Sequence, residues 1–343
     1  MKKSFPSTWD KCFAEKWHWH LQNTGILEPW FKNYPRYEQQ PVKKNPLRCV
    51  FKVQASDGMN YFIKHDKPKG FLSCLKAWFR SKSYAEMQSF MLLKNAGIPC
   101  VEYVGYGEYG KESMLVTKAL DGFMSCQEYW YRYGGKDLEK AELFFQQLCR
   151  LIRLLLERRI HHPDFHSANL MIHPESMDIV LIDLYGVDAG TGSKADMECL
   201  LQIFWDFSEG LSPEQISVYM GACGLTWSVE EKQEFWQMIC QKKLKYIEHE
   251  WQKRKRQILS GNSKFCRTQT GTSRSDSCVI IRNTPWFSVC ERDLESLRVE
   301  KMPHGDAEKI WLDSFRQQLE HREIKKCPLA WQQNPDGSDC LFF

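Results

Sequence analysis

A short run of polar residues near the middle of the chain constrains the fold more than any other feature. The run His162-Pro163-Asp164-Phe165-His166-Ser167-Ala168-Asn169 places an aspartate five residues before an asparagine. A second aspartate, Asp183, follows fourteen residues after that asparagine, at the end of an apolar stretch. Strand-like residues at 170–172 and 179–182, separated by a turn, predict a β-hairpin that carries Asp183 back beside Asn169.

Side chains of these types, gathered on one loop, suit phosphoryl transfer. Asp164 can accept the proton of an attacking hydroxyl, while Asn169 and Asp183 can hold a metal ion that bridges phosphate oxygens. Phosphoryl transfer requires little covalent chemistry from a protein, and depends mainly on positioning and on neutralising charge. We therefore predict that Asp164 is the catalytic base and that Asn169 and Asp183 are magnesium ligands.

Length and composition fit a globular protein large enough for two lobes. The chain has 343 residues, of which 43% are hydrophobic and 26% charged, and these values exclude a disordered or fibrous protein. No run approaches the roughly 18 apolar residues of a transmembrane helix, and the first residues lack the apolar core of a signal peptide. The fourteen cysteines include no C-x-x-C pair, so we expect them to be reduced and structural. We predict a cytoplasmic protein.

The net charge of +4 is too small to indicate nucleic acid, and we expect no such partner. Basic residues are nevertheless concentrated in two stretches. The stretch from Pro68 to Lys82 mixes basic and aromatic residues at roughly helical spacing, which fits either a core-packed helix or a helix lying on anionic lipid. The stretch from Lys253 to Lys264 fits a solvated tail or linker.

The residues before the polar loop predict a small β-rich lobe with one main helix. The turn at Ser56-Asp57-Gly58 joins two alternating segments, which predicts a hairpin whose second strand ends at Lys64. A helix should follow, with Ser83 as its N-cap and Glu86 completing a capping box. The predicted strands of this lobe are 49–53, 61–64, 100–107 and 113–120.

Lys64 and Glu86 are 22 residues apart, one at a strand end and the other on the following helix. In a nucleotide-binding lobe, a glutamate at such a place steadies a lysine against the α and β phosphates. Alternatively, Lys64 is a surface residue and Glu86 serves only the helix cap. The polar loop favours the first interpretation, so we predict that both residues bind the nucleotide.

The chain beyond residue 120 is predicted to be mainly helical. An apolar stripe from Asp137, a candidate N-cap, to Arg159 predicts a long helix that leads into the polar loop. Beyond the second aspartate, thirteen residues lead to Asp196 and a predicted helix over 197–207. Protein kinases use a long segment at this place to present an extended peptide, so we expect a substrate that is not a peptide.

The ends of the chain are harder to interpret. Near the C-terminus, strands are predicted at 277–289 and a helix at 306–320, which ends before a proline as the helix of the small lobe does. This likeness leaves open a degenerate partial repeat of that lobe, although no Lys–Glu pair can be placed in it. The predicted domains are a helical extension over 1–40, the small lobe over 41–120, a helical lobe over 121–258, and an extension of unknown role over 259–343.

The motifs of the small lobe, of the polar loop and around the second aspartate together resemble those of the lipopolysaccharide core kinases of the Kdo/WaaP type, which are enzymes of Gram-negative bacteria. The resemblance implies a two-lobed, protein-kinase-like α+β fold that uses ATP and Mg2+. The acceptor it implies is a Kdo or heptose hydroxyl of the lipid-linked inner core, at the cytoplasmic face of the inner membrane. The motifs, between about 41 and 207, are Tyr61-Phe62-Ile63-Lys64, Ser83-Tyr84-Ala85-Glu86, Ala96-Gly97-Ile98-Pro99, the loop 162–169 and Ile182-Asp183-Leu184.

The resemblance also implies roles for single residues. Lys64 and Glu86 would form the nucleotide-binding ion pair and Asp164 would be the base. His166 stands where small-molecule and sugar kinases of this fold often have histidine, and would touch the transferred phosphate. The wider kinase pattern is broken at the phosphate-binding loop, because no G-x-G-x-x-G motif occurs over 42–53. Other backbone amides, or the side chains of Lys43, Lys44 and Arg48, would have to cover the phosphates.

Three other functions fit parts of the sequence. A small-molecule kinase of the aminoglycoside or choline phosphotransferase type would share the same loop, and a pseudokinase scaffold would explain the missing glycines. A hydrolase with a transition-metal site could use imidazoles together with Asp164, although the order of helix, loop and hairpin explains His162 as a packed support of the loop. The histidines concerned are His161, His162, His166 and His173.

Overall fold

A computed structural model describes most of the chain, in two compact units, Met1–Gln233 and Glu234–Phe343. Within the described residues, no helix is long and apolar enough to cross a bilayer. The boundaries predicted at residues 40, 120 and 258 remain predictions. The described residues are 17–21, 42–44, 47–54, 58–70, 74–75, 77, 80–134, 137–208, 211–260, 265–269, 278–282, 298–319, 328, 330–334 and 336–343.

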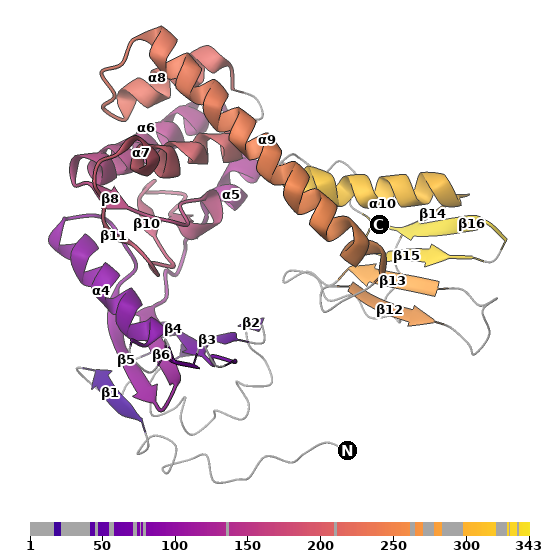
Figure 1. Ribbon diagram of the computed structural model, residues 1–343, viewed down its shortest axis with the longest axis horizontal. Coiled ribbons are helices and arrows are strands. Elements are labelled where there is room, and N and C mark those ends of the chain that lie inside the picture. Colours follow the sequence, from indigo (N-terminus) through magenta and orange to yellow (C-terminus); the bar gives the residue numbers. More distant parts are fainter. Residues whose placement is uncertain are drawn as a thin grey trace. The chain divides into compact units, whose positions relative to one another are not determined.

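The first unit contains a six-stranded antiparallel sheet in the order β1-β5-β6-β4-β3-β2 (Figure 1). Helix α4, Lys82–Asn95, packs against β5 and β6. The predicted hairpin is formed by β3 and β4, with Val50 opposite Lys64. The strands are β1 His18–Leu21, β2 Lys43–Lys44, β3 Arg48–Gln54, β4 Asn60–Asp66, β5 Tyr103–Tyr109 and β6 Glu112–Lys118.

The described part of the N-terminal extension is a strand and not the predicted helix. Strand β1 runs antiparallel to β5, and the rest of residues 1–40, apart from Trp17, lies outside the described residues. Trp17 is buried and stacks on Trp19, with ring centroids 5.7 Å apart, whereas His18 and His20 are exposed. Such alternation has the period of a strand, so the prediction of helix here was wrong.

Helix α4 is capped by Ser81 and not by the predicted Ser83. The Ser81 hydroxyl oxygen accepts a hydrogen bond from the backbone N–H of Tyr84 at 3.1 Å, as an N-cap residue does. Ser83 is fully buried, and its hydroxyl donates to Ser113 Oγ at 3.0 Å. Glu86 therefore takes no part in a capping box.

The remainder of the first unit is mainly helical, as predicted. Asp137 caps helix α6, Leu138–Glu157, by accepting from the N–H of Lys140. The apolar face of α6 is buried and packs partly against α8, Pro213–Ala222. The other elements are β7 Met124–Ser125, α5 Cys126–Tyr129, β8 Ile160–His161, β9 Leu170–Ile172, β10 Ile179–Leu181, β11 Asp188–Ala189 and α7 Lys194–Leu201.

Strands β9 and β10 form the predicted hairpin after the polar loop, with Leu170 opposite Leu181. Backbone hydrogen bonds tie this hairpin to the chain that leaves α4, because Val101 N donates to Leu181 O at 2.8 Å and Leu181 N to Pro99 O at 3.1 Å. A β-rich lobe with one main helix is thus joined to a helical lobe, which confirms the predicted two-lobed α+β architecture.

The second unit has a five-stranded sheet in the order β12-β13-β15-β16-β14. It begins within helix α9, Val229–Ser260, and helix α10, His304–Leu319, packs against β14, β15 and β16. Trp311 of α10 and Trp331 of the sheet are fully buried at the centre of its core. The strands are β12 Phe265–Gln269, β13 Cys278–Arg282, β14 Val299–Pro303, β15 Ala330–Gln333 and β16 Ser338–Phe342.

Both sheets contain a strand–helix–strand–strand segment of the same topology. In β4-α4-β5-β6 and in β14-α10-β15-β16, the last strand lies between the first and the third. This agreement favours the hypothesis of a partial repeat. Lys64 and Lys301 each stand two residues before the end of the first strand, but the Lys301 side chain is 63% exposed and lies 3.6 Å from Asp336. The buried Lys–Glu pair is therefore not repeated at this position.

Replacement of Phe144 by alanine should test the core of the helical lobe. Phe144 is fully buried on α6, so Phe144→Ala should lower the free energy of unfolding by about 3–5 kcal/mol. Leu138 on the same helix is 90% exposed, and Leu138→Ala should change the free energy by less than about 0.5 kcal/mol. Urea denaturation of both variants measures the difference, and equal effects would contradict the packing.

Candidate active site

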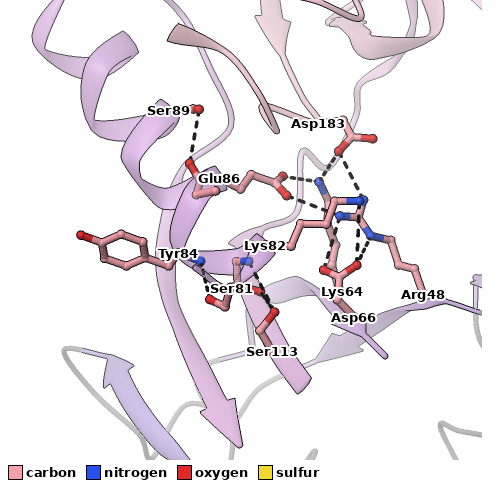
Figure 2. A network of polar contacts seen from close by, with 12 residues as sticks. Arg48, Lys64, Asp66, Ser81, Lys82, Tyr84, Glu86, Ser89, Ser113 and Asp183 are labelled. Atoms are coloured by element: carbon pink, nitrogen blue, oxygen red, sulfur yellow. Dashed lines mark hydrogen bonds and ion pairs between the residues drawn. The ribbon is translucent and has the colours of Figure 1, made fainter. Parts of the chain in front are cut away.

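Charged side chains from both lobes meet in one polar network (Figure 2). They come from β3, β4, the start of α4 and the turn that follows β10. The positive and negative groups are equal in number, so the network is close to neutral as a whole, which is what burial of several charges requires. Its cations are Arg48, Lys64 and Lys82, and its anions are Asp66, Glu86 and Asp183.

Lys64 lies at the centre of this network. Its Nζ is 2.5 Å from Glu86 Oε1 and 3.2 Å from Asp183 Oδ1. Burial lowers the pKa of Lys64, but the charges of Glu86 and Asp183 outweigh that effect, and the pKa is raised overall. The structure thus brings together the two residues predicted to hold the nucleotide, and it keeps the lysine as an ammonium.

Asp183 joins the hairpin to the network. Its backbone has φ 55°, a left-handed conformation that few residues other than glycine, asparagine and aspartate adopt readily. Burial raises the pKa of its carboxyl group, but Lys64 and Arg48 lower it further, to about 2. Asp183 is therefore a carboxylate at neutral pH. A strained backbone at such a position is typical of functional sites.

The polar loop places Asp164 and Asn169 beside each other. Asn169 Nδ2 donates to the Asp164 backbone carbonyl at 3.0 Å and to its Oδ2 at 3.1 Å, which leaves Asn169 Oδ1 as the atom that could hold a metal. Ile182 N donates to Asn169 O at 3.0 Å, so the residue after it, Asp183, follows directly beside the loop. The Asp164 side chain is 67% exposed and can meet a substrate from solution.

His166 faces the carboxylate of Asp164. Its Nδ1 accepts a hydrogen bond from the N–H of Ala168 at 3.2 Å, so in the neutral ring the proton is on Nε2. That nitrogen lies 3.5 Å from Asp164 Oδ1. His166 is thus oriented with a donor toward the predicted base.

Buried groups beneath the loop hold it in place. His162 Nδ1 accepts from the N–H of Asp164 at 3.3 Å, and burial lowers the pKa of His162 to about 4. Asp206 Oδ2 accepts from the N–H of Ser167 at 2.9 Å. His162 is therefore a neutral support of the backbone, as expected.

The hydrolase hypothesis finds no support in this arrangement. His162 Nδ1 accepts a hydrogen bond from the backbone N–H of Asp164, and His173 Nδ1 accepts from the backbone N–H of Ser176 at 3.3 Å. His161 Nδ1 lies 3.0 Å from Asp196 Oδ1. In the described part of the chain, no group of three or more histidine, cysteine, aspartate or glutamate side chains could hold a metal ion.

The short segment after Asp183 is fixed to its surroundings. Val187 O accepts from the Ser89 hydroxyl at 2.6 Å, and Gly190 N donates to Arg159 O at 2.6 Å. Asp196 Oδ2 accepts from the backbone N–H groups of Thr191 and Ser193 as part of the cap of α7. The segment contains only the short strand β11, which pairs with β8. That the substrate is not a peptide stays a prediction.

Sequence reasoning missed three residues of the site. Asp66 is two residues beyond Lys64 on β4 and so shares its face, a signal that strand periodicity offers. Asp206 was hidden in the apolar run 203–207 as its one charged residue. Lys82 was assigned to the basic stretch, but its Nζ lies 4.0 Å from Asp66 Oδ1 and 4.7 Å from the centre of the Tyr185 ring.

Lys82 thus belongs to the charged network, and contact of the stretch from Pro68 to Lys82 with lipid stays a prediction. Burial and the neighbouring charge of Arg48 lower the pKa of Lys82, as expected for a lysine inside the network and not at a headgroup surface. The residues of 68–82 with uncertain placement, 71–73, 76 and 78–79, lie outside the described part.

The residues present fit a magnesium–nucleotide complex. Asn169 Oδ1 and the Asp183 carboxylate are two oxygen donors, fewer than a site built by protein alone would need. Mg2+ is usually held by one or two carboxylates and completes its shell with phosphate oxygens and water. The cations Arg48, Lys64 and Lys82 beside these donors would attract a triphosphate.

Comparisons with known proteins agree with this chemistry. Residues 47–198 match the lipopolysaccharide kinase (Kdo/WaaP) family, a family of phosphotransferases, and this match confirms the predicted resemblance. A search of the curated proteins gave no match.

Among solved structures, the chain is similar to the pseudokinase domain of BIR2, an immune regulator of the RLK/Pelle family, with 14% identity and a TM-score of 0.40 over 66% of this chain and 91% of that one. It is also similar to the autoinhibited serine kinase domain of the giant muscle protein titin, with 13% identity and a TM-score of 0.40 over 64% of this chain and 70% of that one. At such values the likeness shows nothing about activity.

The buried state of His162 predicts a pH dependence of stability. Its pKa is about 4 in the folded protein, against 6.5 for an exposed imidazole. Between these pH values only the unfolded chain binds the proton, so the free energy of unfolding should fall by roughly 3 kcal/mol as the pH decreases from 6.5 to 4. Urea denaturation of the wild type and of His162→Asn across this range measures the difference, and parallel pH curves would contradict the assignment.

Proposed function

We propose that the protein, whose residues 47–198 match the lipopolysaccharide kinase (Kdo/WaaP) family, transfers the γ-phosphoryl group of ATP to a Kdo or heptose hydroxyl of the lipopolysaccharide inner core. The observation that carries the proposal is the exposed carboxylate of Asp164, held by Asn169 beside Asp183. A base, an amide oxygen and a second acid on one short segment are the set that phosphoryl transfer to an alcohol requires.

In this proposal, Asp164 orients the acceptor hydroxyl and accepts its proton as the oxygen attacks phosphorus. Asn169 holds one oxygen of the Asp164 carboxylate, Oδ2, through Nδ2, which leaves Oδ1 for the acceptor hydroxyl. His166 presents Nε2–H beside Oδ1, where it can donate to an oxygen of the transferred phosphate. Each step uses a side chain whose orientation the loop already determines.

The proposed nucleotide site lies in the charged network. Bound Mg2+ would neutralise and orient the phosphates. Asp183 and Asn169 Oδ1 would hold it, and Lys64 would turn from Asp183 toward the α and β phosphates while Glu86 keeps its ammonium in place. Glu86 is suited to this role because its side chain is only 4% exposed and its Oε1 already accepts from Lys64.

The acceptor proposed is lipid-linked, and the chain would act at the cytoplasmic face of the inner membrane. Of the stretch from Pro68 to Lys82, we propose that the part outside the network is a peripheral contact with anionic lipid. Among its described residues, Lys69 and Arg80 are exposed and Leu75 presents a 39% exposed apolar side chain. Basic residues beside exposed apolar ones are typical of surfaces that bind headgroups.

Replacement of the base tests the proposed reaction. Asp164→Asn keeps the size of the side chain and removes its basicity, so kcat for core lipid phosphorylation should fall by roughly a hundredfold or more while ATP still binds. Asp178→Asn is a matched control, because Asp178 is exposed in the turn of the same hairpin. Magnesium-dependent transfer of labelled phosphate measures both variants, and unchanged turnover by Asp164→Asn would remove the assigned base.

The choice of acceptor separates the proposed function from its alternatives. Extracted core lipid should yield a phosphorylated product detected by mass spectrometry, whereas an aminoglycoside and choline should yield none. Product from either small molecule, with none from core lipid, would indicate a small-molecule kinase. A thermal shift with ATP but no product from any acceptor would indicate a scaffold.

A further inference from the structure

We propose that Arg48, anchored by Asp66, binds the phosphates of the nucleotide and takes the place of a glycine-rich loop. The inference rests on the proposed function, since it names a residue of the same nucleotide site. The sequence left Arg48 as one of several candidates for phosphate cover, and the structure adds a partner, Asp66, that has no other proposed role.

Asp66 holds one edge of the Arg48 guanidinium. Arg48 Nε donates to Asp66 Oδ1 at 2.7 Å, and Nη2 lies 3.4 Å from Oδ2. The two residues stand directly opposite each other on β3 and β4. A two-point contact of this kind fixes the plane of the guanidinium as well as its position.

The opposite edge of the guanidinium points into the site. Arg48 Nη1 is 3.4 Å from Asp183 Oδ1, and Nη2 is 3.8 Å from Glu86 Oε2. Asp183 is the proposed metal ligand, and Lys64 contacts the same Oδ1. Arg48 therefore reaches the place where metal and phosphates would meet. A cross-strand ion pair that only stabilised the sheet would not need these additional contacts with Asp183 and Glu86.

Arg48 also stands at the position in the chain where phosphate cover is needed. It is the first residue of β3, separated from β2 by residues 45–47 alone. The sequence of these three residues has no glycine and contains a proline at position 46, which has no backbone N–H to offer a phosphate. Fewer backbone donors are therefore available here than in a glycine-rich loop, and Arg48 is a side chain that the structure directs into the network.

Charge balance favours the same role. The Arg48 side chain is only 13% exposed, and a cation so far from water needs anionic partners. When Asp183 turns to a metal, Arg48 loses one of its carboxylates while Asp66 still holds it. Phosphate oxygens would supply the missing negative charge without any movement of the anchored edge.

Nucleotide affinities test the role of Arg48 in the full chain. Isothermal titration with ATP, ADP and adenosine should show that Arg48→Gln weakens ATP binding by about tenfold or more, while adenosine binding changes by less than about twofold. Lys52→Gln is the matched control. Lys52 lies on the same face of β3 and is also ion-paired, to Asp121 at 3.1 Å, but it is exposed. This control should bind all three ligands as the wild type does.

A second variant distinguishes direct contact from a general disturbance of the lobe. Asp66→Asn keeps the Arg48 charge but loosens its anchor, so ATP affinity should fall by less than in Arg48→Gln, with adenosine affinity retained. Arg48→Lys keeps the charge without the planar fork and should recover only part of the loss. Equal losses for ATP and adenosine, or an ATP affinity unchanged in Arg48→Gln, would overturn the inference.

These outcomes are separable from those of the proposed function. A wild-type protein that binds ATP tightly but phosphorylates no lipid would refute the acceptor and leave the Arg48 measurement valid. A wild-type protein that binds no ATP at all would overturn both.

Discussion

The buried interaction of Lys64 with Glu86 and Asp183 is the contact on which the site depends. It joins β4 of the sheet, helix α4 and the hairpin of the helical lobe through side chains less than 4 Å apart. Removing any one of these charges would unbalance a partly buried network, which costs more than a surface pair contributes. The same contact therefore helps to join the two lobes and sets the ionisation of Lys64 and Asp183.

Local patterns predicted most of the elements that build this contact. The hairpin of β3 and β4, helix α6 with its cap at Asp137, and the hairpin after the polar loop each follow from signals within about 20 residues of sequence. The pairing of Lys64 with Glu86 followed from a different kind of signal, the spacing of two residue types that one reaction needs. Both kinds of signal can be recognised in a single sequence because neither depends on packing between distant parts of the chain.

Other features of the fold and the site could not be predicted from local sequence patterns, for reasons that differ between residues. Ser81 and Ser83 are equally good caps by composition, and only the burial of Ser83 against Ser113 decides between them. Asp206 supports the loop from 39 residues further on, and nothing near it in the sequence indicates that contact. Strand β1 was the avoidable error, since the alternation of tryptophan and histidine at 17–20 already had the period of a strand.

The missing glycine motif has a physical consequence for the lobe. A glycine-rich loop binds phosphate through backbone N–H groups, which carry no net charge and need no counterion. A guanidinium offers stronger hydrogen bonds, but once buried it must be neutralised even when no nucleotide is bound. Asp66 and Asp183 do so for Arg48, and although burial lowers the pKa of Arg48, the hydrogen bond and charges of these carboxylates leave it raised. Replacement of backbone donors by a side chain thus explains why this site contains more carboxylates than catalysis alone requires.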